Sequence, residues 1–277
     1  MGKAMLSGTG KDLVANRERL GAKQKVSLLL NSFRENGIIW TSLLCLYYLA
    51  SSVAEAAFNR LQRRKLRKNL PGVSSLTANK QIWEHWNWEA GGEEWTLSPG
   101  WKDSLIRNVL RRYIPPGGHV LEIGPGAGRW TAVLLEIADT LTGVDLAESC
   151  VRAFKQKFGN RRAQFLVGSG KDLAGIADAS VDSLWSFETF VHINVPETLS
   201  YVREFWRVMR PGSVGVVHHG KSGGIEGGWR SNLTSMTFRQ VLQEHGFKIV
   251  NEFETWSDAG KEYPVGLYHD AITVFTR

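Results

Sequence analysis

Cysteine is nearly absent from the sequence, which holds only Cys45 and Cys150 among 277 residues. Two residues this far apart offer neither the close spacing of a zinc site nor the several pairs of a disulfide framework. A small secreted scaffold held by disulfides is therefore not expected, and a reducing compartment is the simplest interpretation. The sequence also has no visible internal repeat, which argues against a solenoid or a propeller.

Acidic residues are scarce at the start of the chain. Residues 1–70 hold 13 Lys and Arg against 4 Asp and Glu, whereas residues 71–277 hold 21 against 23. The net charge of +7 therefore comes from the first 70 residues. An excess of this kind attracts either nucleic acid or an anionic membrane. Nucleic acid is not expected as a substrate, because the rest of the chain is slightly acidic.

Only one long apolar run is present, and it follows Arg34. Residues 38–54 carry no charge, and six Lys and Arg follow from Arg60 to Lys68. The run is near the lower limit of about 17 to 25 residues for a membrane-spanning helix. It contains one Trp and two Tyr, which are enriched at membrane interfaces. It begins far from Met1 and no small-residue cleavage pattern follows, so we do not expect a secretory signal.

A polar stripe within this segment leaves its arrangement open. The stripe suits a helix that lies on a membrane, or that packs on protein, better than one surrounded by lipid. Residues 13–33 mix basic and apolar side chains and are typical of a basic amphipathic helix. We expect membrane contact through residues 13–68, by spanning or by lying flat, with packing on a partner chain in an oligomer as the alternative. The stripe consists of Thr41, Tyr48, Ser52, Glu55 and Asn59.

Residues 69–75 contain Pro71 and Gly72, which disfavour a helix and indicate a linker. We therefore expect a helical extension over residues 1–70 and a separate domain over residues 71–277. From residue 119 onward, strands and helices alternate regularly, which predicts an α/β fold with a mostly parallel sheet. The expected strands are 119–123, 140–144, 163–167, 181–187, 213–219, 247–254 and 270–276, and the expected helices are 79–88, 101–113, 129–137, 147–158, 196–209 and 235–245.

A glycine-rich turn follows the first of these strands. Gly124, Gly126 and Gly128 recur at a spacing of two, and glycine allows a sharp turn and a close approach to a ligand. The helix that opens next presents unpaired N–H groups to that ligand. The dinucleotide fingerprint would need a third glycine where Arg129 stands. Glu122, at the end of the strand, would repel a pyrophosphate but suits a cationic ligand.

The segment Glu122-Ile-Gly-Pro-Gly-Ala-Gly128 resembles the first motif of the class I S-adenosylmethionine (SAM) dependent methyltransferases. Asp145, at the end of the next expected strand, resembles the acid that holds the ribose hydroxyls in that family. The resemblance covers roughly residues 80–277. It implies SAM as the cofactor and a seven-stranded, mostly parallel Rossmann-like sheet with helices on both faces and an antiparallel last strand. The cofactor-binding residues that it implies are Glu122, Gly124, Gly126, Gly128, Asp145, Ser169, Gly170, Asp172 and Phe187.

Candidate catalytic residues follow the fourth and fifth strands, because ligands of open α/β sheets bind beyond the carboxyl ends of the strands. Transfer of a methyl group to a hydroxyl needs a base, and histidine is suited to this role near neutral pH. The candidates are Glu188, His192, His218 and His219. Strand alternation places His218 and His219 on opposite faces, so at most one of them faces the pocket directly.

The acceptor is predicted only by class. Residues 187–193 and 217–220 resemble a subgroup that acts on natural products or glycans, and no Asn-Pro-Pro-Tyr-like sequence points to N-methylation. The loop 220–230 is expected to form a lid, with Trp229 and Arg230 as substrate contacts. The expected function is thus methyl transfer from SAM to a hydroxyl of a small-molecule or glycan acceptor. No metal is predicted, because an acidic ligand set is not evident.

Two alternatives remain at this stage. A nicotinamide-dependent oxidoreductase could use a similar sheet, although Glu122 and Arg129 count against it. A non-catalytic scaffold with the same fold could instead be held at a membrane. Because SAM is made in the cytosol, we expect a membrane-associated protein whose catalytic domain faces the cytoplasm.

Overall fold

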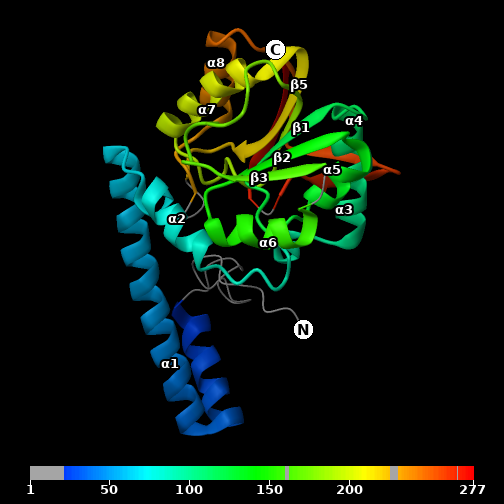
Figure 1. Cartoon of the computed structure of the whole chain (residues 1–277). Coiled ribbons are helices and arrows are strands. Elements are labelled where there is room, and N and C mark those ends of the chain that lie inside the picture. Colours follow the sequence, from blue (N-terminus) through cyan, green and yellow to red (C-terminus); the bar gives the residue numbers. More distant parts are fainter. Residues whose placement is uncertain (1–21, 160–161, 225–229, 267) are drawn as a thin grey trace. The chain divides into compact units, whose positions relative to one another are not determined.

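The computed structural model describes residues 22–159, 162–224, 230–266 and 268–277. The chain forms two compact units, Met1–Leu70 and Pro71–Arg277. Figure 1 shows the described part of the first unit as helix α1 and the second unit as a sheet covered by helices. Each unit is considered by itself below.

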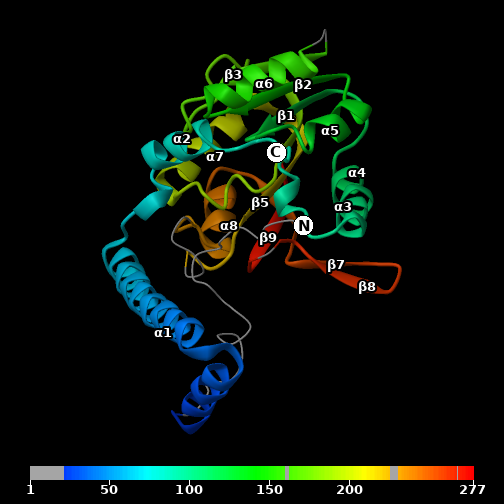
Figure 2. The same ribbon diagram turned by 90° about the horizontal axis from the view of Figure 1, so that it is seen from below.

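In the described part of the first unit the chain forms one interrupted helix, α1 (Ala22–Lys68). Gly37 leaves the helical conformation, with φ 79° and ψ 178°. The hydroxyl of Thr41 donates to the hydroxyl of Ser32 over 3.4 Å, although residues nine apart in a straight helix are separated by about 13 Å along its axis. The chain therefore folds back at Gly37 into two arms, which Figures 1 and 2 show as separate helices joined by a bend.

The second unit is built on a seven-stranded sheet with the order β3-β2-β1-β4-β5-β9-β6. Strands β1 to β5 are parallel, and β9 runs antiparallel to both of its neighbours. The predicted mostly parallel sheet and its antiparallel last strand are therefore confirmed. The strands are β1 (His119–Ile123), β2 (Thr140–Asp145), β3 (Ala163–Val167), β4 (Val181–Ser186), β5 (Met209–Gly220), β6 (Lys248–Phe253) and β9 (Asp270–Thr276).

Helices cover both faces of this sheet, as expected. One apolar core joins α3, α5 and α6 to side chains such as Val120 and Val216. The other joins α7 and α8 to Leu121 and Val217. The strands are buried on both sides because neighbouring residues of one strand enter opposite cores. These helices are α3 (Pro99–Leu105), α5 (Thr131–Ile137), α6 (Glu148–Phe158), α7 (Val195–Val208) and α8 (Ser235–Glu244).

The segment before β1 differs in detail from the sequence prediction. The helix expected over 79–88 is α2 (Leu76–Glu84), and it begins earlier because the Ser75 hydroxyl accepts from Ala78 N–H and caps it. The helix expected over 101–113 is divided by a π-helical turn, Ile106–Leu110, between α3 and α4 (Arg111–Tyr113). Short 3₁₀ turns lie at Gly72–Ser74 and Glu93–Trp95.

A two-stranded hairpin between β6 and β9 was not predicted. It consists of β7 (Thr255–Asp258) and β8 (Lys261–Pro264). Its Trp256 and Tyr263 rings stack with their centroids 5.8 Å apart. The ring N–H of Trp256 donates to Ser104 Oγ over 2.8 Å, which ties the hairpin to α3.

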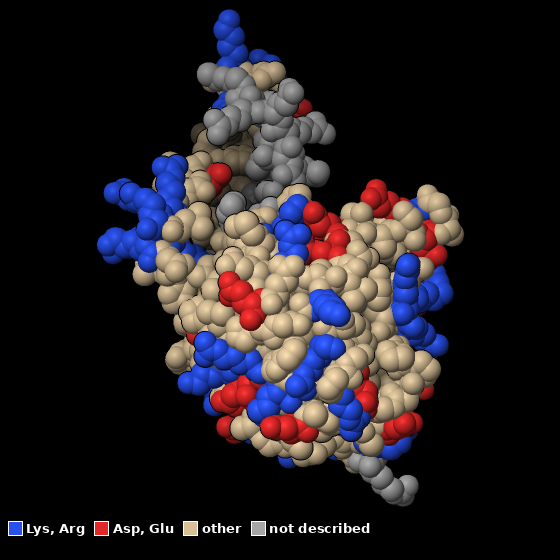
Figure 3. All heavy atoms as spheres, turned by 90° about the horizontal axis from the view of Figure 1, so that it is seen from above, with Lys and Arg blue, Asp and Glu red and all other residues tan. Residues whose placement is uncertain are grey.

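Charges of both signs share the surface. Over the lower half of the face drawn in Figure 3, Lys and Arg side chains are intermixed with Asp and Glu side chains. This agrees with the near balance of charge in residues 71–277.

Candidate active site

The turn between β1 and α5 has the backbone geometry that its glycines allow. Gly124, Gly126 and Gly128 have φ of 66°, 55° and 85°, in the left-handed region that favours glycine. A side chain at Gly124 would overlap Thr189, and one at Gly128 would overlap two phenylalanine rings of α6. At Gly126 the nearest group is the Trp88 ring, 3.1 Å from the position of an added Cβ. Gly126 therefore lies directly under an aromatic side chain at the edge of the sheet.

Asp145, at the end of β2, holds this turn in place. One carboxylate oxygen accepts from Gly126 N–H over 3.1 Å, and the other accepts from Ala147 N–H over 3.0 Å. The residue is only 8% exposed. Burial raises its pKa to about 6, although the backbone hydrogen bonds oppose the shift. The second-strand acid thus sits beside the glycine turn, as the family resemblance implies.

Glu122 is placed differently from the expectation. Its side chain is 1% exposed and accepts from the Thr131 hydroxyl over 2.6 Å, under the start of α5. Burial raises its pKa to about 8, so the carboxyl is largely neutral at pH 7. In this arrangement Glu122 joins strand to helix, and it presents no exposed negative charge to a cationic ligand.

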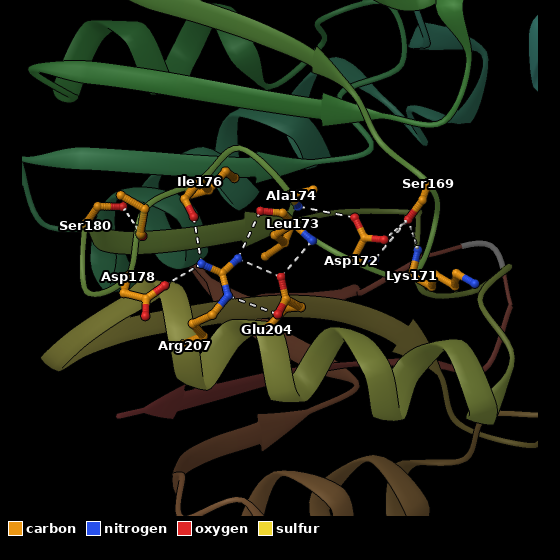
Figure 4. A network of polar contacts seen from close by, with 11 residues as sticks. Ser169, Lys171, Asp172, Leu173, Ala174, Ile176, Asp178, Ser180, Glu204 and Arg207 are labelled. Carbon is orange, nitrogen blue, oxygen red and sulfur yellow. Dashed lines mark hydrogen bonds and ion pairs between the residues drawn. The ribbon is translucent and has the colours of Figure 1, made fainter.

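The loop after β3 is braced by its own side chains and by α7. Ser169 Oγ donates to Asp172 Oδ2 over 2.6 Å, and this hydrogen bond lowers the pKa of Asp172. Arg207 donates to the carbonyl oxygens of Leu173 and Ile176 and forms ion pairs with Asp178 and Glu204, as Figure 4 shows. Ser169 and Asp172 are therefore engaged within their own loop. Gly170 is buried, and a side chain there would overlap Leu76 at the start of α2.

The loop after β4 brings Phe187 and Glu188 to the glycine turn. Glu188 has φ 60° and forms an ion pair with Arg129, the residue that follows the turn. The guanidinium carbon of Arg129 also lies 4.9 Å from the Trp130 ring and 5.9 Å from the Phe187 ring. The Arg129 side chain is only 6% exposed, and the ion pair with Glu188 balances its buried positive charge. Spacing along the sequence gave no signal for this pair.

His218, in β5, contacts the loop that follows β4. Its Nδ1 accepts from Glu188 N–H over 3.0 Å, and its Nε2 lies 3.2 Å from Asp270 Oδ2. Burial lowers the pKa of His218 to about 3, which keeps the ring neutral. Arg230 forms an ion pair with the same Asp270. Arg230, expected to contact substrate, therefore contacts β9 in this structure, and Trp229 lies outside the described residues.

His219 occupies the opposite face of the sheet, as alternation along β5 predicts. Its ring centroid lies 4.6 Å from that of Phe238 in α8, and its Nε2 lies 2.7 Å from Thr273 Oγ1. His218 and His219 are 1% and 0% exposed. Neither imidazole is accessible to an acceptor in this structure, and the geometry gives both of them a supporting place within the sheet.

His192 is the candidate histidine that remains partly exposed. It ends the loop after β4, and its ring lies 5.1 Å from the Trp83 ring, edge to face. Asn79 of α2 donates to His192 O over 2.9 Å, and Asn194 donates to Ser74 O over 2.7 Å. These bonds fix α2 against the loop that carries Glu188 and His192.

A cluster of tryptophans covers this edge of the sheet. The Trp83 ring lies 5.4 to 6.1 Å from the rings of Trp86, Trp88 and Trp95. Of these, Trp88 is the one that contacts the glycine turn. The arrangement brings an aromatic wall, a histidine and the glycine turn together at the carboxyl ends of β1 and β4, where open α/β sheets bind ligands.

Residues 121–217 match the family model described as "Methyltransferase domain". The matched segment runs from β1 to β5 and includes the glycine turn, Asp145 and the loop after β4. This segment is thus similar to that family, and the order of the seven-stranded sheet agrees with the Rossmann-like methyltransferase fold expected from the sequence.

Two curated proteins illustrate the relationship. The chain is 32% identical over 117 residues to "O-methyltransferase cnsE" of Penicillium expansum. The matched segment covers 40% of this chain and 41% of that protein. The chain is 27% identical over 127 residues to "Ubiquinone biosynthesis O-methyltransferase" of Xanthomonas campestris pv. campestris, covering 45% and 52%. The chain therefore matches about half of the length of these relatives, or less.

A solved structure shares the fold. The S-adenosylmethionine-dependent methyltransferase of Mesorhizobium loti superposes with a TM-score of 0.55 at 14% identity, covering 64% of this chain and all of that one. At this identity the likeness concerns the fold alone.

Proposed function

We propose that this protein transfers a methyl group from S-adenosylmethionine to a hydroxyl of a small-molecule or glycan acceptor. The observation that carries the proposal is the glycine turn after β1, which Asp145 holds through Gly126 N–H below the ring of Trp88. This turn lies at the sheet edge where such folds bind their cofactor.

The cofactor would be held chiefly by the backbone. The positive φ of Gly124, Gly126 and Gly128 shapes the turn, whose backbone would face the methionine part, and Phe187 would border the same region. In this proposal Asp145 accepts the ribose hydroxyls, because its carboxylate lies beside the turn and is mostly ionised above pH 6. SAM carries an activated methyl group, so the protein must mainly position an acceptor in line with it.

His192 is the favoured general base. It is partly exposed beside Trp83, whereas His218 and His219 are fully buried. Glu188 lies nearby, but its carboxylate is already engaged in the ion pair with Arg129. In this arrangement His192 takes the hydroxyl proton while the methyl group leaves the sulfonium, and Glu188 helps to orient the loop.

The choice of oxygen as the methylated atom rests on the relatives, which are named O-methyltransferases. The wall formed by Trp83, Trp86, Trp88 and Trp95 suits an acceptor with a flat apolar face, because stacked rings gain from such contact. A sugar ring has such a face, and so does an aromatic alcohol.

Calorimetry of the full chain tests the cofactor. SAM should bind and NADH should not, and Gly126→Val should lose SAM binding while its circular dichroism stays that of the parent. An acceptor screen with radiolabelled SAM and host extracts then tests turnover. Binding of NADH without SAM would refute the proposal, and SAM binding without any transfer would favour the non-catalytic scaffold.

A further inference from the structure

The outer side of α1 is apolar and exposed. On the arm after Gly37, Ile39, Leu43, Leu46 and Val53 are 60 to 76% exposed, and they recur at helical spacing on one side. Soluble monomers rarely expose a continuous apolar surface of this kind, which marks an interaction site. Among the described residues, α1 is the one helix long and apolar enough to cross a membrane by length and composition. The arm before Gly37 adds exposed Val26, Leu30 and Phe33.

We propose that the folded-back helix α1 is a monotopic anchor that lies flat in the surface of an anionic lipid bilayer, with its outer apolar side inserted. The proposal is independent of the methyl-transfer reaction. It differs from a spanning helix in one structural respect, the reversal of the chain at Gly37.

Two members of the polar stripe, Thr41 and Tyr48, lie on the inner side of the fold, whereas its other three members are exposed. Thr41 bonds Ser32 of the other arm, and Ser32 is 8% exposed. Thr41, Leu44, Tyr48 and Ser51 are less exposed than their neighbours and recur on this inner side. The first arm begins at Ala22, about as many residues before Gly37 as Ser51 lies after it. The open end of the first arm therefore lies near the level of Ser51. Where the two arms face each other, they therefore partly shield Ser32, Thr41 and Tyr48 and leave apolar side chains outside.

Charge complementarity selects lipid as the occupant. Within residues 22–68 there are nine Lys and Arg against two Glu. Six of these cations lie between Arg60 and Lys68, immediately after the apolar part, and all of them except the buried Lys65 are exposed. Basic residues beside an inserted apolar surface are attracted to anionic lipid headgroups, and their long stems let the charges reach the interface. A protein partner would instead need a matching acidic patch beside an apolar groove.

The position of the charges favours the flat orientation over an upright one. Lys25 lies about 18 Å from Gly37 along the first arm, at 1.5 Å per residue, and the hydrocarbon core is about 30 Å thick. If the bend reached the far surface, Lys25 would lie near the middle of the bilayer. If Lys25 stayed at the near surface, Arg34 and Glu35 at the bend would lie near the middle of the bilayer instead. A flat hairpin keeps all of these charges at headgroup level.

Vesicle flotation of the full chain tests the lipid surface. The protein should float with phosphatidylcholine vesicles that contain phosphatidylserine, bind pure phosphatidylcholine more weakly, and be released by alkaline carbonate. The double variant Leu43→Glu/Leu46→Glu should reduce binding by at least tenfold. Its matched control, Ser52→Glu/Asn59→Glu, adds the same charge on the polar stripe and should stay within threefold of the parent. Equal losses in both variants would overturn the assignment to the outer side.

Cysteine labelling tests the orientation. In a Cys45→Ser background the remaining Cys150 is buried, so Asn36→Cys adds one accessible thiol at the bend. With the protein added outside sealed vesicles, a membrane-impermeant maleimide should label position 36 as fast as it does in solution. In the same background, Leu46→Cys places a thiol on the outer side of α1, and it should react at least fivefold more slowly once vesicles are added. Protection of position 36, or resistance to carbonate, would overturn the flat orientation in favour of a hairpin or helix that crosses the bilayer core. A discrete oligomer that ignores vesicles would establish the partner-packing alternative.

Discussion

Gly128 should be intolerant of any side chain, because the side chain would overlap the phenylalanine rings of α6. This packing effect can be measured separately from backbone strain. The φ of Gly128 is 85°, and an added Cβ would lie 2.7 Å from Phe154 and would overlap Phe158 as well. Gly212 has nearly the same φ, 82°, but nothing lies within 4 Å of the added Cβ. Gly212→Ala therefore carries only the left-handed cost, about 1 to 2 kcal/mol. Gly128→Ala carries that cost together with overpacking of the interface between the turn and α6, about 1 to 3 kcal/mol more.

Thermal unfolding of the full chain measures the difference. For a unit of this size, 1 kcal/mol corresponds to about 2 to 4 °C in Tm, so Gly128→Ala should melt about 4 to 8 °C below Gly212→Ala if overpacking adds about 2 kcal/mol. Comparing the two variants cancels the backbone term and the change in unfolded-state entropy. Equal melting temperatures would show that the phenylalanines of α6 move aside freely, and the packing argument would then fail.

Four further predictions concern the site. Glu122→Gln should make stability less dependent on pH between about 6.5 and 8: the folded carboxyl has a pKa of about 8, so the parent loses stability as pH rises there, by at most about 1.4 kcal/mol per pH unit. Thermal melts across that range measure the slope, and an unchanged slope would contradict the assigned pKa. His192→Ala should bind SAM normally in calorimetry and lose transfer by about 100-fold; near-parental turnover would move the base elsewhere. Arg129→Met should lower the free energy of unfolding by about 1 to 3 kcal/mol in denaturant titrations, because it leaves the Glu188 carboxylate without its partner, and a neutral effect would show that water replaces the pair. Trp88→Ala should change SAM affinity with little effect on stability, since its ring covers Gly126 at a partly exposed edge; an unchanged affinity would place the cofactor away from that ring.

The sequence sufficed for the sheet because both of its signals are local. Apolar runs mark strands that are buried on both faces, and the spacing between them indicates the crossover helices. The glycine turn could be read as well, since positive φ at Gly124, Gly126 and Gly128 is a requirement that few other residues meet. Asp145 was then identified from its place at the end of the next predicted strand and from the family resemblance.

The hairpin β7–β8 escaped prediction because it is short and lies at the edge of the unit. Its signal was present in the alternation of Trp256 and Tyr263 around Ala259-Gly260, which permits a tight turn. The π-helical turn at Ile106–Leu110 gave no comparable signal. The periodicity of apolar residues does not distinguish a π-helical turn, which has one extra residue, from an ordinary α-helical turn.

The candidate catalytic residues show where sequence reasoning stops. Alternation along β5 separated His218 from His219 correctly, but burial of both depends on long-range packing against Phe187 and Phe238. The same holds for Asp270, which joins His218 to Arg230 across the sheet. Such contacts join residues far apart in the chain, and no local pattern encodes them.

The tryptophan cluster gives the protein its own optical probe. The indole rings of Trp83, Trp86, Trp88 and Trp95 lie with centroids 5.4 to 6.1 Å apart, close enough for their electronic transitions to couple. Coupled transitions give circular dichroism bands of opposite sign whose size depends on the angle between the rings. Any ligand that enters beside Trp88 must alter that angle or the polarity around it. Occupation of the site can therefore be followed by its spectrum in the unlabelled protein, before the acceptor is known.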